Sequence, residues 1–116
     1  MRNITSGLWL VLTGVGHNLI GLALRGDELA AIVSDGLFDT LSSAEREAAF
    51  WFEAGGILMI LLGALMRHGE LRGAPPPRWL GWSLLLSGLL GAVCLPVCGF
   101  WLIVLQGAWL LRRYRS

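Results

Sequence analysis

The charged residues of this chain fall into clusters separated by long apolar runs, and this separation restricts its fold more than any other feature. The run Ile4–Leu24 contains one ionisable residue, His17, and the run Ala49–Met66 contains one, Glu53. The run Trp79–Leu111 contains no Asp, Glu, Lys, Arg or His. A helix needs about 20 mostly apolar residues to cross the hydrocarbon of a bilayer. The runs therefore predict an integral membrane protein.

The composition agrees with a membrane protein and excludes other classes. Of the 116 residues, 55% are hydrophobic and 15% are charged, whereas soluble domains carry about 25% charged residues. The length accommodates one domain, residues 1–116. No basic patch or phosphate-binding loop is present in the sequence, so no nucleic-acid partner is expected. The first apolar run is longer than the core of a signal peptide and is not followed by a typical cleavage site, so we interpret it as an uncleaved span.

The last apolar run is too long for one span. As a single helix it would measure about 50 Å, against a hydrocarbon core of about 30 Å. Pro96 and Gly99 lie in its middle and favour a turn. The sequence therefore predicts an all-α fold, a four-helix membrane bundle with helices at about residues 4–24, 43–66, 79–95 and 99–113.

The distribution of arginine predicts the orientation of these spans. In a four-span protein seven arginines share one side, and only Arg25 and Arg46 lie on the other; the seven are Arg2, Arg67, Arg72, Arg78, Arg112, Arg113 and Arg115. Because cytoplasmic loops are enriched in Lys and Arg, both termini are expected in the cytoplasm. The acidic segment 25–48 between the first two helices then faces outward. The tryptophans are expected near the two membrane surfaces.

The outer segment contains signals for local structure. Residues Asp27–Val33 can form a short helix that Gly36 ends, and Ser42 and Glu45 have the spacing of a capping box for a helix that begins near Ser43. Two interpretations remain open for this segment. It is either a solvated connector or a lid on the outer face.

Glycine recurs every seven residues within the predicted helices, at Gly7, Gly14 and Gly21, at Gly56 and Gly63, and at Gly81 and Gly88. Small residues at this period let membrane helices pack closely with left-handed crossings. The alternative is that these glycines line a ligand slot.

The two ionisable residues inside the spans are the candidate site. At 1.5 Å per residue, His17 lies about 10 Å and Glu53 about 6 Å below the outer surface, on helices that are consecutive in sequence. Asn18 neighbours His17, and Trp51 and Trp101 are expected at a similar level. Three interpretations are open for this polar core. His17 and Glu53 hydrogen-bond to each other or to a backbone carbonyl and hold the two helices together, or they line a pocket for a small or lipidic molecule, or Glu53 is a proton-coupled transport site.

The cysteines and the second histidine suggest no cofactor and no metal site. Cys94 and Cys98 flank Pro96, but an i, i+4 pair on a helix is poorly placed for a disulfide, so we interpret them as small buried apolar residues; a redox role is the alternative. His68 lies in a predicted cytoplasmic loop far from His17, and no set of metal ligands assembles within one chain.

Several segments resemble a known family. These are Gly14–Gly21, Ala49–Glu53, Gly55–Gly63 and Pro96–Leu102. They are similar to a group of small bacterial four-span membrane proteins that is catalogued as a domain of unknown function, in the neighbourhood of DoxX-like membrane proteins. The resemblance covers nearly the whole chain and implies a four-helix fold in the bacterial inner membrane, with no catalytic residues to transfer.

We therefore expect a multi-pass inner-membrane protein that binds a small apolar or amphipathic molecule in an outer-half pocket near His17 and Glu53. A proton-coupled small transporter and a structural accessory subunit are the alternatives. The expected partners are the lipid bilayer and such a ligand, and the fold is compatible with a homo-oligomer.

Overall fold

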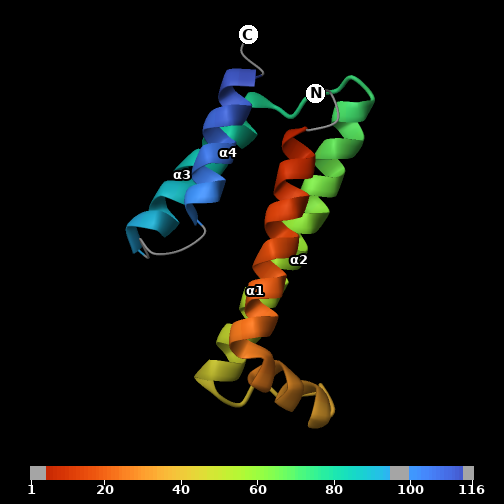
Figure 1. Cartoon of the computed structure of the whole chain (residues 1–116), viewed down its shortest axis with the longest axis vertical. Helices are drawn as coiled ribbons and strands as arrows, with labels where there is room; N and C mark the ends of the chain where they lie inside the picture. Colours follow the sequence, from red (N-terminus) through yellow and green to blue (C-terminus); the bar gives the residue numbers. More distant parts are fainter. Residues whose placement is uncertain (1–4, 95–99, 114–116) are drawn as a thin grey trace.

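The computed structural model of the chain describes residues 5–94 and 100–113. This part of the chain folds into four α-helices, which confirms the all-α prediction (Figure 1). The helices are α1 (Ser6–Ser34), α2 (Ala44–Leu71), α3 (Arg78–Cys94) and α4 (Phe100–Arg113).

The helices form two antiparallel hairpins of unequal length (Figure 1). α1 packs along α2, α3 packs along α4, and α1 also contacts α4. Within the described residues, no Cα atom of α2 lies within 8 Å of one in α3 or α4. The hairpins therefore meet along one edge only, through α1 and α4.

The buried core lies at the end of the molecule where α1 begins and α4 ends. It contains one side chain from each helix, namely Leu10, Met66, Leu80 and Leu110. All four helices therefore converge at this end, which we call the inner end. The other end of the α1–α2 hairpin, the outer end, extends beyond the α3–α4 hairpin (Figure 1).

α1 is longer than predicted, because the expected separate helix at residues 27–33 is continuous with it. The only interruption is a kink at Arg25, with φ −127° and ψ 22°. No proline lies in this stretch, so the chain bends without ending the helix. The predicted stop at Gly36 is confirmed: Gly36 has φ +96°, and the N–H of Leu37 donates to the Ile32 carbonyl at 3.1 Å.

α2 begins as predicted but ends later. Its cap is Ser43 rather than Ser42, and the Ser43 hydroxyl accepts from the N–H of Arg46 at 3.2 Å. The helix continues past the expected end at Met66, although His68 and Gly69 are weak helix formers. It ends at Leu71, before Gly73 with φ +81° and three prolines. α3 and α4 begin and end within one residue of the predicted bounds, and the turn predicted at Pro96 and Gly99 lies outside the described residues.

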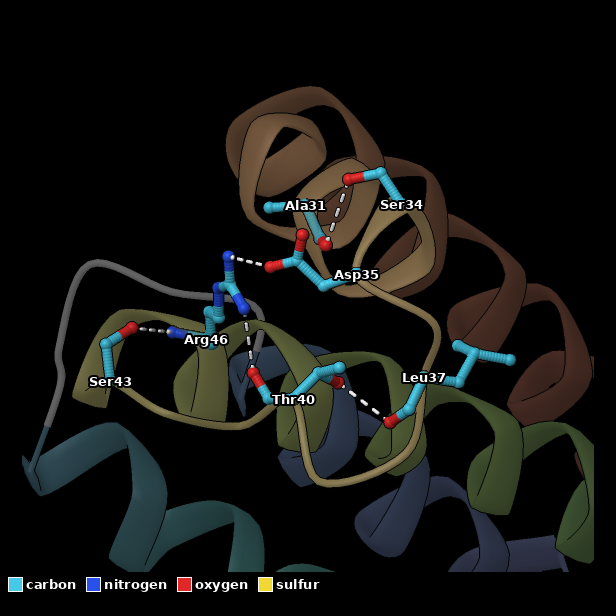
Figure 2. Close-up of polar contacts among 7 residues, drawn as sticks. All are labelled: Ala31, Ser34, Asp35, Leu37, Thr40, Ser43 and Arg46. Atoms are coloured by element: carbon cyan, nitrogen blue, oxygen red, sulfur yellow. Dashed lines mark hydrogen bonds and ion pairs between the residues drawn. The ribbon is translucent and has the colours of Figure 1, made fainter.

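A hydrogen-bond network closes the connection between α1 and α2 (Figure 2). The Arg46 guanidinium donates to the Asp35 carboxylate at 2.8 Å and to the Thr40 carbonyl at 2.9 Å. The Thr40 hydroxyl in turn donates to the Leu37 carbonyl at 2.8 Å, and the Leu37 side chain points away from this network. The connection is therefore a folded loop built around Arg46. Its role as a lid stays a prediction.

Much of the apolar surface of the helices is uncovered. By length and composition α1 and α2 are able to cross a membrane, and α3 is a shorter apolar helix. In the most apolar stretch of each of the two long helices, 22% of the residues are buried inside the molecule. The exposed large side chains of these three helices include Leu12, Leu19, Ile20, Leu22, Leu24, Ile57, Leu58, Leu61, Leu65, Leu86 and Leu90.

Candidate functional site

The glycines of α1 and α2 set the register in which the site residues meet. A Cβ atom at Gly63 would lie 2.7 Å from the Gly7 carbonyl, and one at Gly14 would lie 2.9 Å from the Gly56 carbonyl. The backbones therefore approach closely at both levels, which confirms the predicted role of these glycines in packing. Seven residues further along α1, Gly21 lies against Glu53 of α2.

His17 projects from α1 onto the backbone and ring of Phe52 in α2. Its ring stacks on the Phe52 ring, with centroids 3.7 Å apart and an interplanar angle of 12°. Its Nε2 atom lies 2.8 Å from the Phe52 carbonyl oxygen. Because a carbonyl only accepts hydrogen bonds, Nε2 carries the proton and donates it. The imidazole is thus oriented by a stack and by one hydrogen bond.

Asn18, the next residue of α1, reaches Glu53. With its amide nitrogen turned toward the two acceptor oxygens there, Asn18 donates to the Glu53 carbonyl at 3.2 Å and to its Oε2 atom at 3.3 Å. The absence of a side chain at Gly56 makes room for the Asn18 amide, because a Cβ atom at Gly56 would collide with it.

The two carboxylate oxygens of Glu53 differ, because Oε2 accepts from Asn18 and Oε1 does not. Among the described residues, Oε1 is buried and has no hydrogen-bond partner. It lies against Gly21, where a Cβ atom would collide with Oε1 and come within 2.7 Å of the Phe52 ring. Buried polar atoms without a partner are rare and costly, so Oε1 is the atom of the site with capacity for another group.

His17 and Glu53 have separate partners. No direct hydrogen bond joins their side chains in the described part of the chain: His17 bonds to the Phe52 carbonyl, and Glu53 receives Asn18. A hydrogen bond from His17 to a backbone carbonyl of α2 is one of the contacts expected if these residues hold the two helices together. The structure nevertheless brings His17, Asn18 and Glu53 together on one stretch of the α1–α2 contact, and it adds Phe52. We call these four residues the polar site.

The two tryptophans predicted near the site are both exposed, and Trp51 immediately precedes Phe52 in the chain. Trp51 is exposed on α2 and packs edge-on against Phe50, with centroids 5.1 Å apart. Trp101 is exposed on α4, a helix that contacts α1 but not α2 within the described residues. Neither tryptophan takes part in the hydrogen bonds of the polar site.

A second polar cluster at the inner end holds the start of α1. The Glu70 carboxylate accepts from the N–H of Gly7 at 2.7 Å and from that of Ser6 at 3.1 Å. The Gln106 side chain, fully buried on α4, donates to the Ser6 carbonyl at 2.7 Å. Arg67 donates to the Thr5 hydroxyl at 3.1 Å. The sequence contains one indication of this cluster. The first N–H groups of any helix have no acceptor within the helix, so residues from elsewhere must supply acceptors.

The cysteines and potential metal ligands add no further site. Cys94 is a free, exposed thiol, which is contrary to the expectation that it is buried, and Cys98 lies outside the described residues. No group of three or more His, Cys, Asp or Glu side chains that could hold a metal ion is found in the described ranges.

Comparison with known proteins identifies a family but no activity. The model of a family of unknown function, DUF6463, matches residues 1–116. The chain matches none of the curated proteins and none of the solved structures.

Proposed function

Since the chain belongs to the DUF6463 family of unknown function, its family supplies no activity, and we propose one from its own residues. The proposal is a small protein of the bacterial inner membrane that binds a small amphipathic molecule at the polar site. The observation that carries it is the buried Glu53 Oε1 atom, which has no hydrogen-bond partner among the described residues.

The exposed apolar surface supports the membrane location. Lipid-facing side chains are apolar because the bilayer core offers no hydrogen bonds, and the surface of α1 and α2 has this character along most of its length. The proposed topology has four spans, with the shorter helices α3 and α4 completing the crossing. Both termini lie in the cytoplasm, on the side with most of the arginines. A relation of the family to DoxX-like membrane proteins, based on sequence resemblance, belongs to the same proposal.

The environment of Glu53 supports the binding of an amphipathic molecule. A hydroxyl or amine of the ligand would donate to Oε1 and remove the cost of an unsatisfied buried acceptor, about 1–3 kcal/mol. Ile57 follows Glu53 by four residues on the same face of α2, and Leu24 follows Gly21 by three on α1; both side chains are exposed. They would contact the apolar part of the ligand.

The same oxygen supports a second candidate, a proton-coupled small transporter. Ionisable residues within membrane spans commonly mark proton or ion pathways. In this case Glu53 would bind and release a proton during transport. A third candidate, a structural accessory subunit, requires no ligand and uses the polar site only to join α1 to α2.

Two substitutions at Glu53 separate these candidates. Glu53→Gln keeps the size of the side chain and an acceptor oxygen, whereas Glu53→Leu leaves the Asn18 amide without its side-chain acceptor, at a cost of about 1–3 kcal/mol. If the site binds a ligand, Glu53→Leu should lose saturable binding of dodecyl amphiphiles by the protein in detergent, and Glu53→Gln should weaken it; the ligand-dependent rise in melting temperature measures both. A transporter predicts that Glu53→Gln binds normally but abolishes proton-coupled flux in liposomes. A change in stability alone, with no amphiphile bound by the unmodified protein, would reject the binding function.

A further inference from the structure

Every hydrogen-bond donor of the polar site is already engaged. The His17 Nε2–H group donates to the Phe52 carbonyl, and the Asn18 amide donates to the carbonyl and Oε2 of Glu53. The group that satisfies Oε1 must therefore bring its own N–H or O–H donor.

No cationic side chain is paired with the Glu53 carboxyl group among the described residues of the site. Arg25 lies one turn after Gly21 and is exposed, and no ion pair joins it to Glu53 in the part of the chain that the structure describes. The neighbours of the carboxylate are a neutral amide, a glycine and the Phe52 ring. An ionised carboxylate removed from water is costly unless it is paired with a positive charge. A cationic ligand would supply this charge together with its donor.

The outer segment next to the site is acidic. Residues 25–48 contain six acidic side chains, at Asp27, Glu28, Asp35, Asp39, Glu45 and Glu47, and two basic ones, Arg25 and Arg46. Clusters of one sign of charge raise the local concentration of ions of the opposite sign and repel ions of the same sign. The approach to Glu53 from the outer end therefore favours cations over anions.

We propose that the ligand class of the polar site is an amphipathic primary or secondary amine, a proposal that rests on the proposed binding function. The ammonium group supplies an N–H donor to Glu53 Oε1 and a positive charge to the carboxylate, and its apolar chain lies along the exposed side chains of α1 and α2. A free hydrophobic amine and the amine of a phospholipid headgroup share this chemistry.

The test compares four amphiphiles that have the same chain and different headgroups. Purified full-length protein in detergent is heated with dodecylamine, dodecyltrimethylammonium, 1-dodecanol or dodecanoate, and the rise in melting temperature gives the apparent affinity. We expect dodecylamine to bind at least tenfold more tightly than the other three. Dodecyltrimethylammonium has charge without a donor, 1-dodecanol has a donor without charge, and dodecanoate has the wrong charge. Equal affinity for 1-dodecanol or dodecyltrimethylammonium would overturn the amine proposal and leave ligand binding intact. If no amphiphile binds, the proposed function itself fails.

Variants localise the effect to Glu53. Glu53→Gln should remove the tenfold preference for dodecylamine. Gly21→Ala should also reduce it, because a methyl group there collides with Oε1 and the net charge is unchanged. Glu70→Gln makes the same change in charge at the inner end. This variant should still bind dodecylamine at least tenfold more tightly than it binds the other three amphiphiles. Retention of the preference by both Glu53→Gln and Gly21→Ala would overturn the assignment to this site.

An experiment in lipid nanodiscs distinguishes a free hydrophobic amine from the amine of a phospholipid headgroup. In nanodiscs of phosphatidylcholine, addition of phosphatidylethanolamine should weaken dodecylamine binding if the headgroup amine is the occupant. Unchanged binding assigns the site to a free amine.

Discussion

At the scale of single residues, the start of α1 depends on a carboxylate near the C-terminal end of α2, which lies beside it at the inner end. The first N–H groups of a helix have no acceptor within the helix, and Glu70 accepts from two of them, those of Ser6 and Gly7. A negative charge at this end also interacts favourably with the helix dipole. Both effects stabilise the inner end of the molecule.

Replacement of Glu70 should therefore destabilise the protein. We expect Glu70→Ala to lower the free energy of unfolding by about 1–3 kcal/mol, because two partly buried N–H groups lose a charged acceptor. Glu70→Gln should cost less, since its amide oxygen still accepts. The measurement is denaturant unfolding in detergent, with the exposed Glu47→Ala as control. A loss for Glu70→Ala no larger than that of the control would contradict the capping role.

The sequence predicted three residues of the polar site, His17, Asn18 and Glu53, but neither Phe52 nor how the residues are paired. His17, Asn18 and Glu53 were expected at one level because their depth follows from helix rise alone. The partner of His17 is a backbone carbonyl, and every residue carries one, so no residue type signals it. The role of Glu70 was missed because an apolar run ends at Met66, whereas backbone hydrogen bonds carry α2 on to Leu71.

At the scale of the helices, the glycines of the α1–α2 contact can be ranked by what a methyl group would meet. A Cβ atom at Gly63 would lie 2.7 Å from both the Gly7 carbonyl and the Val11 N–H nitrogen, which are backbone atoms that cannot rotate away. A Cβ atom at Gly16 would meet nothing within 4 Å. The two glycines therefore differ in packing although both belong to the α1–α2 hairpin.

Alanine substitution should distinguish them. Gly63→Ala is expected to separate the helices and cost about 1–3 kcal/mol through overpacking. Gly16→Ala should be neutral or stabilise by up to about 1 kcal/mol, because alanine is the better helix former. Melting temperatures in the same detergent give the comparison. Equal shifts for the two variants would show that α1 and α2 do not approach closely at Gly63.

The seven-residue glycine period was sufficient to predict this close contact, because it places small residues on one face of each helix. The ends of the helices were less predictable. The chain kinks at Arg25 but stays helical, so two predicted helices form one, although Gly26 follows the kink and a glycine commonly marks a helix end.

At the scale of the whole molecule, one buried amide joins the two hairpins. Gln106 Nε2 donates to the carbonyl and hydroxyl of Ser6, whereas Gln106 Oε1 has no partner among the described residues. The sequence predicted four helices but not two hairpins that diverge, because the angle between hairpins depends on a few such contacts rather than on a periodic pattern.

Substitution of Gln106 should change the association of the hairpins. Gln106→Leu removes both an unsatisfied acceptor and a donor, so we expect a change within about 1 kcal/mol. Gln106→Glu places a carboxylate against the Ser6 carbonyl in a buried position and should weaken the contact between α1 and α4 by several kcal/mol. Spin labels at the exposed positions of Leu61 on α2 and Leu86 on α3, in a protein without native cysteines, report the distance between hairpins. An unchanged distance and stability in Gln106→Glu would contradict this role.

The proposed topology makes a further prediction for the whole chain. A reporter that is active only in the cytoplasm should be active when fused after Ser116. Asp39→Cys, in a protein without native cysteines, should react with a membrane-impermeant thiol reagent added from outside. A silent reporter after Ser116 would contradict the four-span topology and the depth assigned to Glu53.

The contacts of Ser6 also impose an order on biosynthesis. Its backbone N–H bonds to a residue 64 positions later, and its carbonyl accepts from one 100 positions later. At a translation rate of about 5–20 residues per second, the first partner emerges roughly 3–13 s after Ser6 and the second roughly 5–20 s after it. The first turn of α1 therefore lacks these two partners until α2, and then α4, has been synthesised.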